Sequence, residues 1–294
     1  MLTIALGAED LATTRFAISP LWEAIASLRQ LRRPRSAEFA PWRREVARRV
    51  AGTELRPLFD LVPDEERGIP HELVPVPLGS GPDFATELRD MAGDDADLTG
   101  RLRRYWNAAV APHWPAIRRV NERDIFYRTR MLVEGGFAAV FSDLSEQVSY
   151  RDGVLSVRHR RFSGDVALEG RGLVLVPSVF AGDSVHSYVH PPGTAVLRYR
   201  PRGTAELWNS GPREPTEALA ALLGRGRAAV LTALADPATT TGLAEATGLT
   251  PGAVSQHLKV LHAAGVVRRF RVGRYVHYSR TTAGEAIASS AAGS

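Results

Sequence analysis

The chain has 294 residues and a formal net charge of +5, with 37 lysines and arginines against 32 acidic residues. This length suffices for two domains with separate hydrophobic cores. The basic balance is expected for a nucleic-acid partner but does not prove one. The absence of cysteine excludes disulfides and thiolate metal sites. No apolar run approaches the roughly 18 residues of a membrane-spanning helix, and the first ten residues lack a signal-peptide pattern, so we expect a cytoplasmic protein without a membrane partner.

The first 148 residues are mostly helical by periodicity, after one predicted strand at 2–6. The predicted helices cover residues 20–31, 37–51, 84–91, 98–110 and 114–144. Gly135 and Gly136 interrupt the last and longest of them, so a kink or a break is expected there.

From residue 149 the pattern changes to an alternation with period two, which is typical of half-buried strands. The predicted strands cover residues 154–159, 165–168, 173–176, 187–189 and 196–200. Glycine, proline and aspartate separate these short segments. The sequence therefore predicts a small antiparallel sheet after the helical region.

The N-terminal two hundred residues give few specific signs of chemistry. Asp183, His186 and His190 are metal-ligand residue types, but their spacing does not fix a common face, and isolated surface histidines are the favoured interpretation. No phosphate-binding loop, dinucleotide fingerprint, nucleophile elbow or zincin motif occurs. We therefore predict no catalytic residue, no metal site and no cofactor.

Two other features of this region could contact ligands. Arginine runs could bind phosphate, although solvated helix faces with nearby acids are favoured; they lie at 29–35, 43–49, 101–104 and 158–161. Four tryptophans could line a pocket for an apolar or aromatic effector, although core packing is favoured for most; they are Trp22, Trp42, Trp106 and Trp114.

Proline and glycine cluster between residues 201 and 215, as a linker requires. We predict an N-terminal effector or dimerisation region at 1–205, helical over 1–148 and strand-rich over 149–205. A linker at 206–215 and a C-terminal domain at 216–294 follow. Trp208 is expected to pack the linker onto a neighbouring domain.

Residues 239–265 read as a helix, a tight turn and a second helix. Gly248 stands at the turn, where glycine takes a positive φ without steric cost. Thr250 and Pro251 are suited to the N-cap and first position of the second helix, and Gly265 is suited to its end. The apolar stripe of this helix consists of Val254, Leu258 and Leu261.

The opposite face of this second helix is small and polar, which suits a major groove. It presents Gly252, Gln256, Lys259 and Ala263, flanked by Ser255, His257 and His262. An ordinary helical hairpin with a solvated face is the alternative interpretation, and the agreement of cap, turn and stripe disfavours it.

A predicted hairpin follows, with strands at 267–271 and 275–279 joined through Val272 and Gly273. A two-residue turn there would place Arg271 opposite Arg274. These like charges would repel one another unless an anion, such as a DNA phosphate, lay between them. Four arginines within seven residues, without an acid among them, favour a DNA-contacting wing over a solvated hairpin.

These residues resemble the ArsR-type repressors. SQHLKVL (255–261) followed by AGVV (264–267) is similar to the family signature S-x-H-L-x-x-L…A-G-L-V, and Gly273, Arg274 and Tyr278 are similar to its G-R…Y wing. The resemblance covers about residues 215–285. It implies a homodimeric transcription factor, usually a repressor. The recognition-helix residues that it implies are Thr250, Ser255, Gln256, His257 and Lys259.

The chain departs from this family in its metal sites. It has no cysteine, and residues 281–294 contain neither Asp nor His, so both well-known types of ArsR metal site are missing. The opening segment 16–31 also resembles the start of an uncharacterised domain that is often fused to ArsR-type modules, which suggests an architecture but no ligand.

Together the patterns predict an α+β protein with a mostly helical N-terminal region, a small antiparallel sheet and a C-terminal winged helix-turn-helix. We expect a dimeric, sequence-specific DNA-binding regulator that recognises an inverted repeat in double-stranded DNA, with a small-molecule effector as a further partner. Its wing contacts are predicted at Arg269, Arg271 and Arg274. An enzyme of unknown reaction with a DNA-binding regulatory tail remains the alternative.

Overall fold

The computed structural model describes the chain as two compact units, Met1–Trp208 and Asn209–Ser294. The division falls inside the segment that the sequence marks as a linker. The α+β class is confirmed, since helices and small sheets occur in both units. The description covers the whole chain except residues 33–35, 52–53, 63–68, 71–72, 74, 78–82, 160–162, 191–192, 209–214, 236, 273–274 and 291–294.

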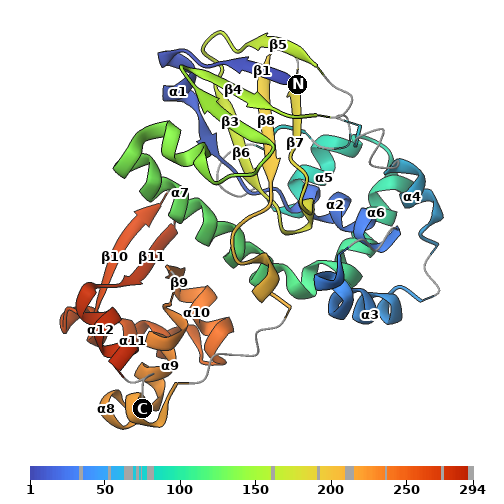
Figure 1. Ribbon diagram of the computed structural model, residues 1–294. Helices are drawn as coiled ribbons and strands as arrows, with labels where there is room; N and C mark the ends of the chain where they lie inside the picture. Colours follow the sequence, from blue (N-terminus) through green and yellow to red (C-terminus); the bar gives the residue numbers. More distant parts are fainter. Residues whose placement is uncertain are drawn as a thin grey trace. The chain divides into compact units, whose positions relative to one another are not determined.

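The helices of unit 1 gather mainly at one end, and its strands at the other (Figure 1). The helices are α1 (Ala8–Thr13), α2 (Pro20–Arg32), α3 (Ala40–Arg49), α4 (Arg56–Leu61), α5 (Phe84–Ala92), α6 (Ala96–Ala109) and α7 (Trp114–Ser142). All five helices predicted from periodicity are confirmed in position. The six-residue helices α1 and α4 were not predicted, because so short a segment shows no periodicity.

A first hydrophobic core lies among α2, α3, α5, α6 and the start of α7. Trp22, Trp42 and Trp106 are buried in it, which confirms core packing as their use. Trp208 packs on the same core, with its ring 6.3 Å from Phe39 and 6.0 Å from Phe180. This contact confirms that Trp208 holds the start of the linker against a folded unit.

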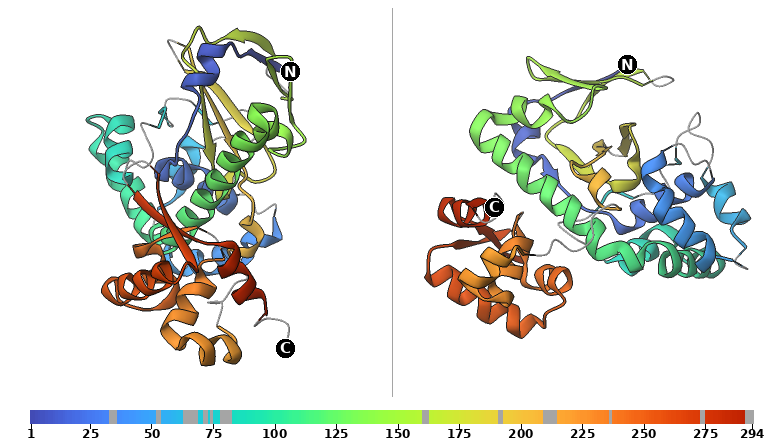
Figure 2. Two further views of the ribbon diagram at one scale, coloured as in Figure 1. Left: turned by 90° about the vertical axis from the view of Figure 1, so that its left-hand side faces the viewer. Right: turned by 60° about the horizontal axis from the view of Figure 1, so that its bottom comes forward.

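The kink in α7 is confirmed at the paired glycines. Gly136 has φ 66° and Gly135 has a non-helical φ of −143°, a combination that breaks the hydrogen-bond ladder. α7 runs between the helical end and the sheets of unit 1 (Figure 2). Its two halves therefore contribute to different cores, Ile117 to the helical one and Val140 to the one beside the sheets.

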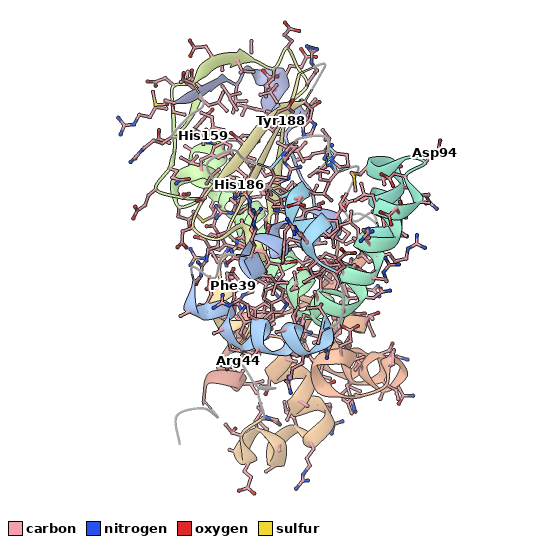
Figure 3. The ribbon with its side chains drawn as sticks, turned by 90° about the vertical axis from the view of Figure 1, so that its right-hand side faces the viewer. Phe39, Arg44, Asp94, His159, His186 and Tyr188 are labelled. Carbon is pink, nitrogen blue, oxygen red and sulfur yellow. The ribbon has the colours of Figure 1, made fainter. Side chains whose placement is uncertain are left out.

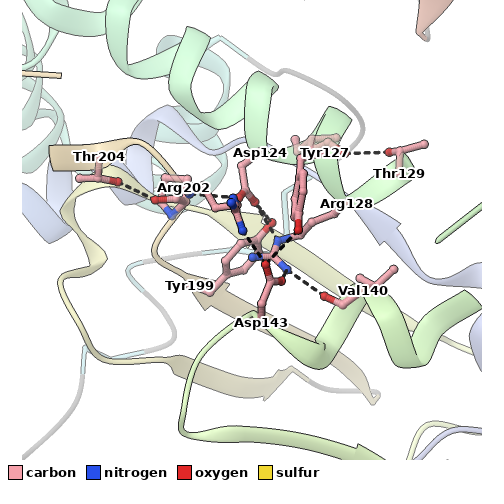
Figure 4. Close-up of polar contacts among 11 residues, drawn as sticks. Asp124, Tyr127, Arg128, Thr129, Val140, Asp143, Tyr199, Arg202 and Thr204 are labelled. Carbon is pink, nitrogen blue, oxygen red and sulfur yellow. Dashed lines mark hydrogen bonds and ion pairs between the residues drawn. The ribbon is translucent and has the colours of Figure 1, made fainter. Parts of the chain in front are cut away.

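A buried polar network joins the two halves of α7 to a strand (Figure 4). Arg128 donates through Nε to Asp124 Oδ2 at 2.9 Å and through Nη1 to the Val140 carbonyl at 2.8 Å. Tyr199 donates its hydroxyl to the same Asp124 oxygen at 2.7 Å. Since Arg128 lies before the kink and Val140 after it, this guanidinium bridges the break in the helix.

The described residues of unit 1 form two four-stranded sheets, with orders β3-β4-β1-β5 and β2-β6-β8-β7. The strands are β1 (Leu2–Ala5), β2 (Arg15–Phe16), β3 (Val148–Arg151), β4 (Val154–Val157), β5 (Gly164–Ala167), β6 (Leu173–Pro177), β7 (His186–His190) and β8 (Thr194–Tyr199). A second hydrophobic core is formed by residues of both sheets and the end of α7.

The prediction of one small antiparallel sheet was wrong in topology. β1 pairs in parallel with β5, and β6 pairs in parallel with both β2 and β8. The cause is that two strands come from the first sixteen residues and enter sheets whose other members lie beyond residue 147. The division into a helical part at 1–148 and a strand-rich part at 149–205 is therefore not a structural boundary.

Unit 2 has the element order of a winged helix-turn-helix. It comprises α8 (Glu217–Leu223), α9 (Arg225–Ala233), β9 (Ala238–Thr239), α10 (Thr240–Thr247), α11 (Pro251–Ala263), β10 (Val267–Val272), β11 (Tyr275–Arg280) and α12 (Thr282–Ser290). Its sheet has the order β10-β11-β9. One core is formed by the apolar faces of α9, α10 and α11 and the base of the hairpin.

Candidate nucleic-acid interface

The turn between α10 and α11 has the predicted geometry. Gly248 adopts φ 70° and ends α10. The Thr250 hydroxyl caps α11, since it accepts a hydrogen bond from the Ala253 amide at 3.2 Å, and Pro251 occupies the first turn. Gly265, with φ 70°, follows Ala264, the C-cap of the helix. Local backbone chemistry therefore fixes where α11 starts and stops.

The buried stripe of α11 determines which of its residues face outward. Val254, Leu258 and Leu261 are buried in the core of unit 2. The exposed residues on the other side include Gly252, Ser255, Gln256 and Lys259, and Thr250 is exposed at the N-terminal end of the helix. Four of the five recognition-helix residues predicted from the sequence are thus accessible on one helix, with Thr250 also occupied as its cap.

His257 occupies a different environment from the other predicted contacts. Its side chain is half-buried, and its ring lies over Gly226 near the start of α9. A β-carbon at Gly226 would clash with His257 Nε2 and would also lie 3.0 Å from Cε1 and 3.2 Å from Cδ2, which is tighter than most real contacts. This placement gives His257 a packing contact that spacing alone did not reveal.

The register of the wing differs from the predicted one. Val272 pairs with Tyr275, so the connection consists of residues 273–274, and Arg271 pairs with Val276. The prediction that Arg271 lies opposite Arg274 was therefore wrong, because β10 extends one residue further than expected. Arg274 itself lies outside the described residues.

The described arginines of the wing fall on different faces of the hairpin. Arg269 and Arg271 are exposed and alternate with Phe270 along β10, which puts these two arginines on one face. Arg268 points to the other face, where its Nε donates to Ser279 Oγ at 3.0 Å. Arg269 and Arg271 are thus placed side by side along the wing.

Arg280 anchors the wing, a role that sequence analysis missed. Its Nε donates to the Leu231 carbonyl at 2.9 Å and its Nη2 to the Thr232 carbonyl at 3.0 Å. These carbonyls belong to the last turn of α9, where they also accept from the backbone amides of Leu234 and Ala235 at 3.2 Å. An arginine at the end of the second strand offers no signal of this role in the sequence, since the contact joins residues 48 positions apart.

Electrostatics favour an anionic partner for this surface. No acidic residue occurs between positions 246 and 284, whereas this stretch contains Lys259 and five arginines. A surface with cations and no acids attracts the phosphate backbone of nucleic acids and speeds association with it.

The candidate metal residues of unit 1 do not converge. Asp183 pairs with Arg200 at 2.6 Å, and the His186 ring lies 5.3 Å from Trp22. His190 is buried, so the favoured interpretation of isolated surface histidines was wrong for it. Within the described ranges, no three histidine or acidic side chains form a group that could hold a metal ion. Figure 3 marks His186 beside Tyr188 and His159 in this unit.

Two of the arginine runs of unit 1 show the pairing that the sequence suggested. Arg49 pairs with Glu45 at 2.6 Å and Arg101 with Asp97 at 2.7 Å, each one helical turn apart. Such exposed pairs neutralise the charge that a phosphate would need. Residues 33–35 and 160–161 of the other runs lie outside the described part.

Among the described residues, no helix is both long and apolar enough to cross a bilayer.

Comparison with known proteins gives one family match. No curated protein and no solved structure was found to match the chain. Residues 225–269, from α9 into β10, match the family described as bacterial regulatory protein, arsR family, which supports a DNA-binding transcriptional regulator.

Proposed function

We propose that the protein is a dimeric, sequence-specific transcriptional repressor of the ArsR type that acts without thiolate metal sensing. The observation that carries this proposal is the exposed face of α11 beside a wing without acidic residues. The cap at Thr250 and the buried stripe hold that face in a fixed orientation, as base recognition requires.

The proposed contacts divide into two classes. Gln256 and Lys259, with Ser255 beside them, read base edges in the major groove. Arg269, Arg271 and Arg274 bind phosphates, so they position the protein without reading the sequence. Thr250 places the end of the helix at the groove, and His257 acts through its packing on Gly226.

The proposed partner is an inverted-repeat operator in double-stranded DNA. A two-fold dimer requires half-sites about 10 bp apart, or a multiple of one helical turn. In this proposal residues 216–294 bind DNA, residues 206–215 connect, and residues 1–205 sense an effector or enlarge the dimer in the cytoplasm.

Fluorescence anisotropy with the DNA upstream of its own gene tests the proposal. We expect salt-dependent binding to one segment, with a shuffled segment bound more weakly by a factor of roughly 10³ or more. Equal binding to all sequences, or no binding at low salt, would contradict a specific regulator. Sedimentation of the protein–DNA complex measures whether two chains bind one operator, as a dimer requires.

An enzymatic role for unit 1 is the second candidate. The Ser187 hydroxyl lies 2.6 Å from His159 Nε2, the arrangement of a nucleophile with its base. Labelling of Ser187 by a fluorophosphonate would support this role. The enzymatic role would be excluded if Ser187 stayed unlabelled in the folded protein and unit 1 affected only regulation.

A further inference from the structure

Three polar side chains meet over the sheet β2-β6-β8-β7 at the first turn of α2. Arg198 lies on β8, Trp22 on α2 and Glu87 on α5, and none is more than 3% exposed. The Arg198 guanidinium carbon is 4.6 Å from the centre of the Trp22 ring, a cation–π arrangement. Glu87 acts electrostatically on Arg198.

Trp22 and Glu87 each bury one polar atom without a hydrogen-bond partner. These atoms are the indole Nε1 of Trp22 and the carboxyl Oε1 of Glu87. The second oxygen of Glu87 accepts from the Leu21 amide at 2.8 Å and from Ser19 Oγ at 3.0 Å, so it caps α2. The fold thus uses one oxygen of Glu87 and the ring of Trp22. The other oxygen of Glu87 and the indole nitrogen of Trp22 have no hydrogen-bond partner. Buried polar groups in this condition are uncommon.

The charge of the cluster suits an anion. Burial raises the pKa of Glu87 to about 7, so this carboxyl group can hold a proton and donate it near neutral pH. Burial, and then the charge of Arg29, lower the pKa of His186 to about 3, so the histidine beside Trp22 adds no charge. A guanidinium, an indole N–H and a protonated carboxyl group are all donors.

The same face of the sheet is apolar next to Arg198. Val176 is the cross-strand neighbour of Arg198, and Val174 is that of Val196. These valines form a small apolar cluster with Ala17, against which Val76 packs. The donors therefore border an apolar strip, as in a site for a ligand with a charged head and an apolar body.

We propose that this cluster binds a small organic carboxylate, held at its charged end by Arg198, the Trp22 indole N–H and Glu87. The apolar part of the ligand lies against the valines of β6 and β8. Because Pro75 contacts Arg198 through its carbonyl and Val76 packs on the valines, binding requires a local displacement of these two residues. The ligand serves as the effector of the regulator; this output rests on the proposed function, whereas binding itself does not.

Indole NMR of the full-length protein tests the site without DNA. The chain has five tryptophans, so protein labelled with ¹⁵N-tryptophan gives five indole signals, and the Trp22→Phe variant identifies one of them. The probes are acetate, benzoate and phenylacetate, each compared with its primary amide. We expect at least one carboxylate to shift the Trp22 signal downfield in a saturable manner, and its amide not to.

Calorimetry of the effective probe with three variants follows. Trp22→Phe keeps an aromatic ring beside Arg198 and removes the N–H donor together with the five-membered ring, so the dissociation constant should rise about tenfold, the effect of one charge-assisted hydrogen bond. Glu87→Gln retains a donor and should bind, whereas Trp114→Phe, a matched control, should equal the wild type. The proposal is overturned if no carboxylate shifts the signal, if amides shift it equally, or if Trp22→Phe binds as well as the wild type.

The regulatory output has its own readout. The effective probe should change the affinity for the upstream DNA in the wild type and not in Trp22→Phe. Probe binding with unchanged DNA affinity would refute the effector role alone. A protein that binds the probe and no DNA would refute the regulator proposal and leave the site in place.

Discussion

Unit 1 and unit 2 differ in how far along the chain their critical contacts reach. In unit 2 the start of helix α11 is determined by residues next to it, such as the Thr250 cap and the turn glycine Gly248. In unit 1 the buried carboxylate of Glu23 accepts from Asn121, 98 positions away, and from Ser178, 155 positions away. The comparison shows why a local pattern explains one unit and not the other.

Glu23 illustrates the dependence of unit 1 on distant partners. Besides the two side chains, its carboxylate accepts from the amides of Val179 at 2.8 Å and Phe180 at 3.1 Å. Burial raises the pKa of Glu23, and the four hydrogen bonds oppose that rise. A glutamate in an amphipathic helix is ordinarily exposed, so its sequence context gives no sign of this site.

The largest effect should follow the loss of Arg128. In Arg128→Met the carboxylate of Asp124 stays buried without its cation, which should cost about 3–5 kcal/mol of the free energy of unfolding. All five tryptophans lie in unit 1, so urea unfolding followed by tryptophan fluorescence reports on it. Arg130→Met breaks an exposed pair with Glu134 and should change the free energy by less than about 1 kcal/mol. Equal losses of free energy in both variants would contradict the expected difference between the buried and the exposed ion pair.

Glu87 should make unit 1 sensitive to pH. Its pKa is raised to about 7, above the unfolded value, so its contribution to stability is complete below about pH 4.5 and is lost as the pH rises through 7. The loss between pH 5 and pH 8 should approach roughly 3 kcal/mol. Arg198 and Asp90 are the charged groups that act on it.

Glu87→Gln should remove this loss, because the amide keeps the cap on α2 and cannot ionise. The measurement is urea unfolding by tryptophan fluorescence at both pH values. Glu134→Gln, on the exposed part of α7, is the control and should retain the wild-type pH dependence. An unchanged slope in Glu87→Gln would show that the carboxyl group is ionised throughout this range.

Gly226→Ala extends the comparison to unit 2, where it tests a contact between separate helices. The added methyl group meets His257, so stability and DNA affinity should fall by about 1–3 kcal/mol, as in overpacked cores. Gly252→Ala, with open space around it in the protein, should not lose stability; because Gly252 lies on the exposed face of α11, this variant is a control for stability alone. Circular dichroism and anisotropy measure the two effects.

His257→Ala should rescue Gly226→Ala, since it removes the ring that the methyl group meets. The double variant should bind DNA better than Gly226→Ala alone. If the two losses add instead, the contact between His257 and Gly226 has no energetic role.

Gln256→Ala tests the exposed face of α11, which is determined by residues close to it in the sequence. Sequence discrimination should fall by about 1–3 kcal/mol at the base that Gln256 reads, while stability stays unchanged because the side chain is exposed. Anisotropy on the cognate operator and its single-base variants measures this. A neutral Gln256→Ala would place the reading face elsewhere on α11.

The smallest effect should come from the wing. Arg274→Ala should weaken binding to all sequences alike and reduce the slope of affinity against salt by about one. A titration of salt on cognate and shuffled DNA measures both. A sequence-dependent loss would give Arg274 a base contact.

Predictions from the sequence were most accurate where they depended on capping and periodicity, which act over a few residues. The limits of α11, its buried stripe and the kink of α7 at Gly136 follow from such rules. The pairing of strands does not: β1 enters a sheet with β5, about 160 positions away in register. The rules for a strand specify which face is apolar, but not which other strand it pairs with.

By itself the sequence determined the order of the winged helix-turn-helix and the residues exposed on its second helix, because caps, glycines and the apolar period act through neighbouring backbone groups. Only the tertiary structure decided the mixed sheets, the burial of Glu23, Glu87 and Arg198, and the packing of His257 on Gly226. These features depend on contacts between distant elements, and such contacts exist only once both elements have formed and packed.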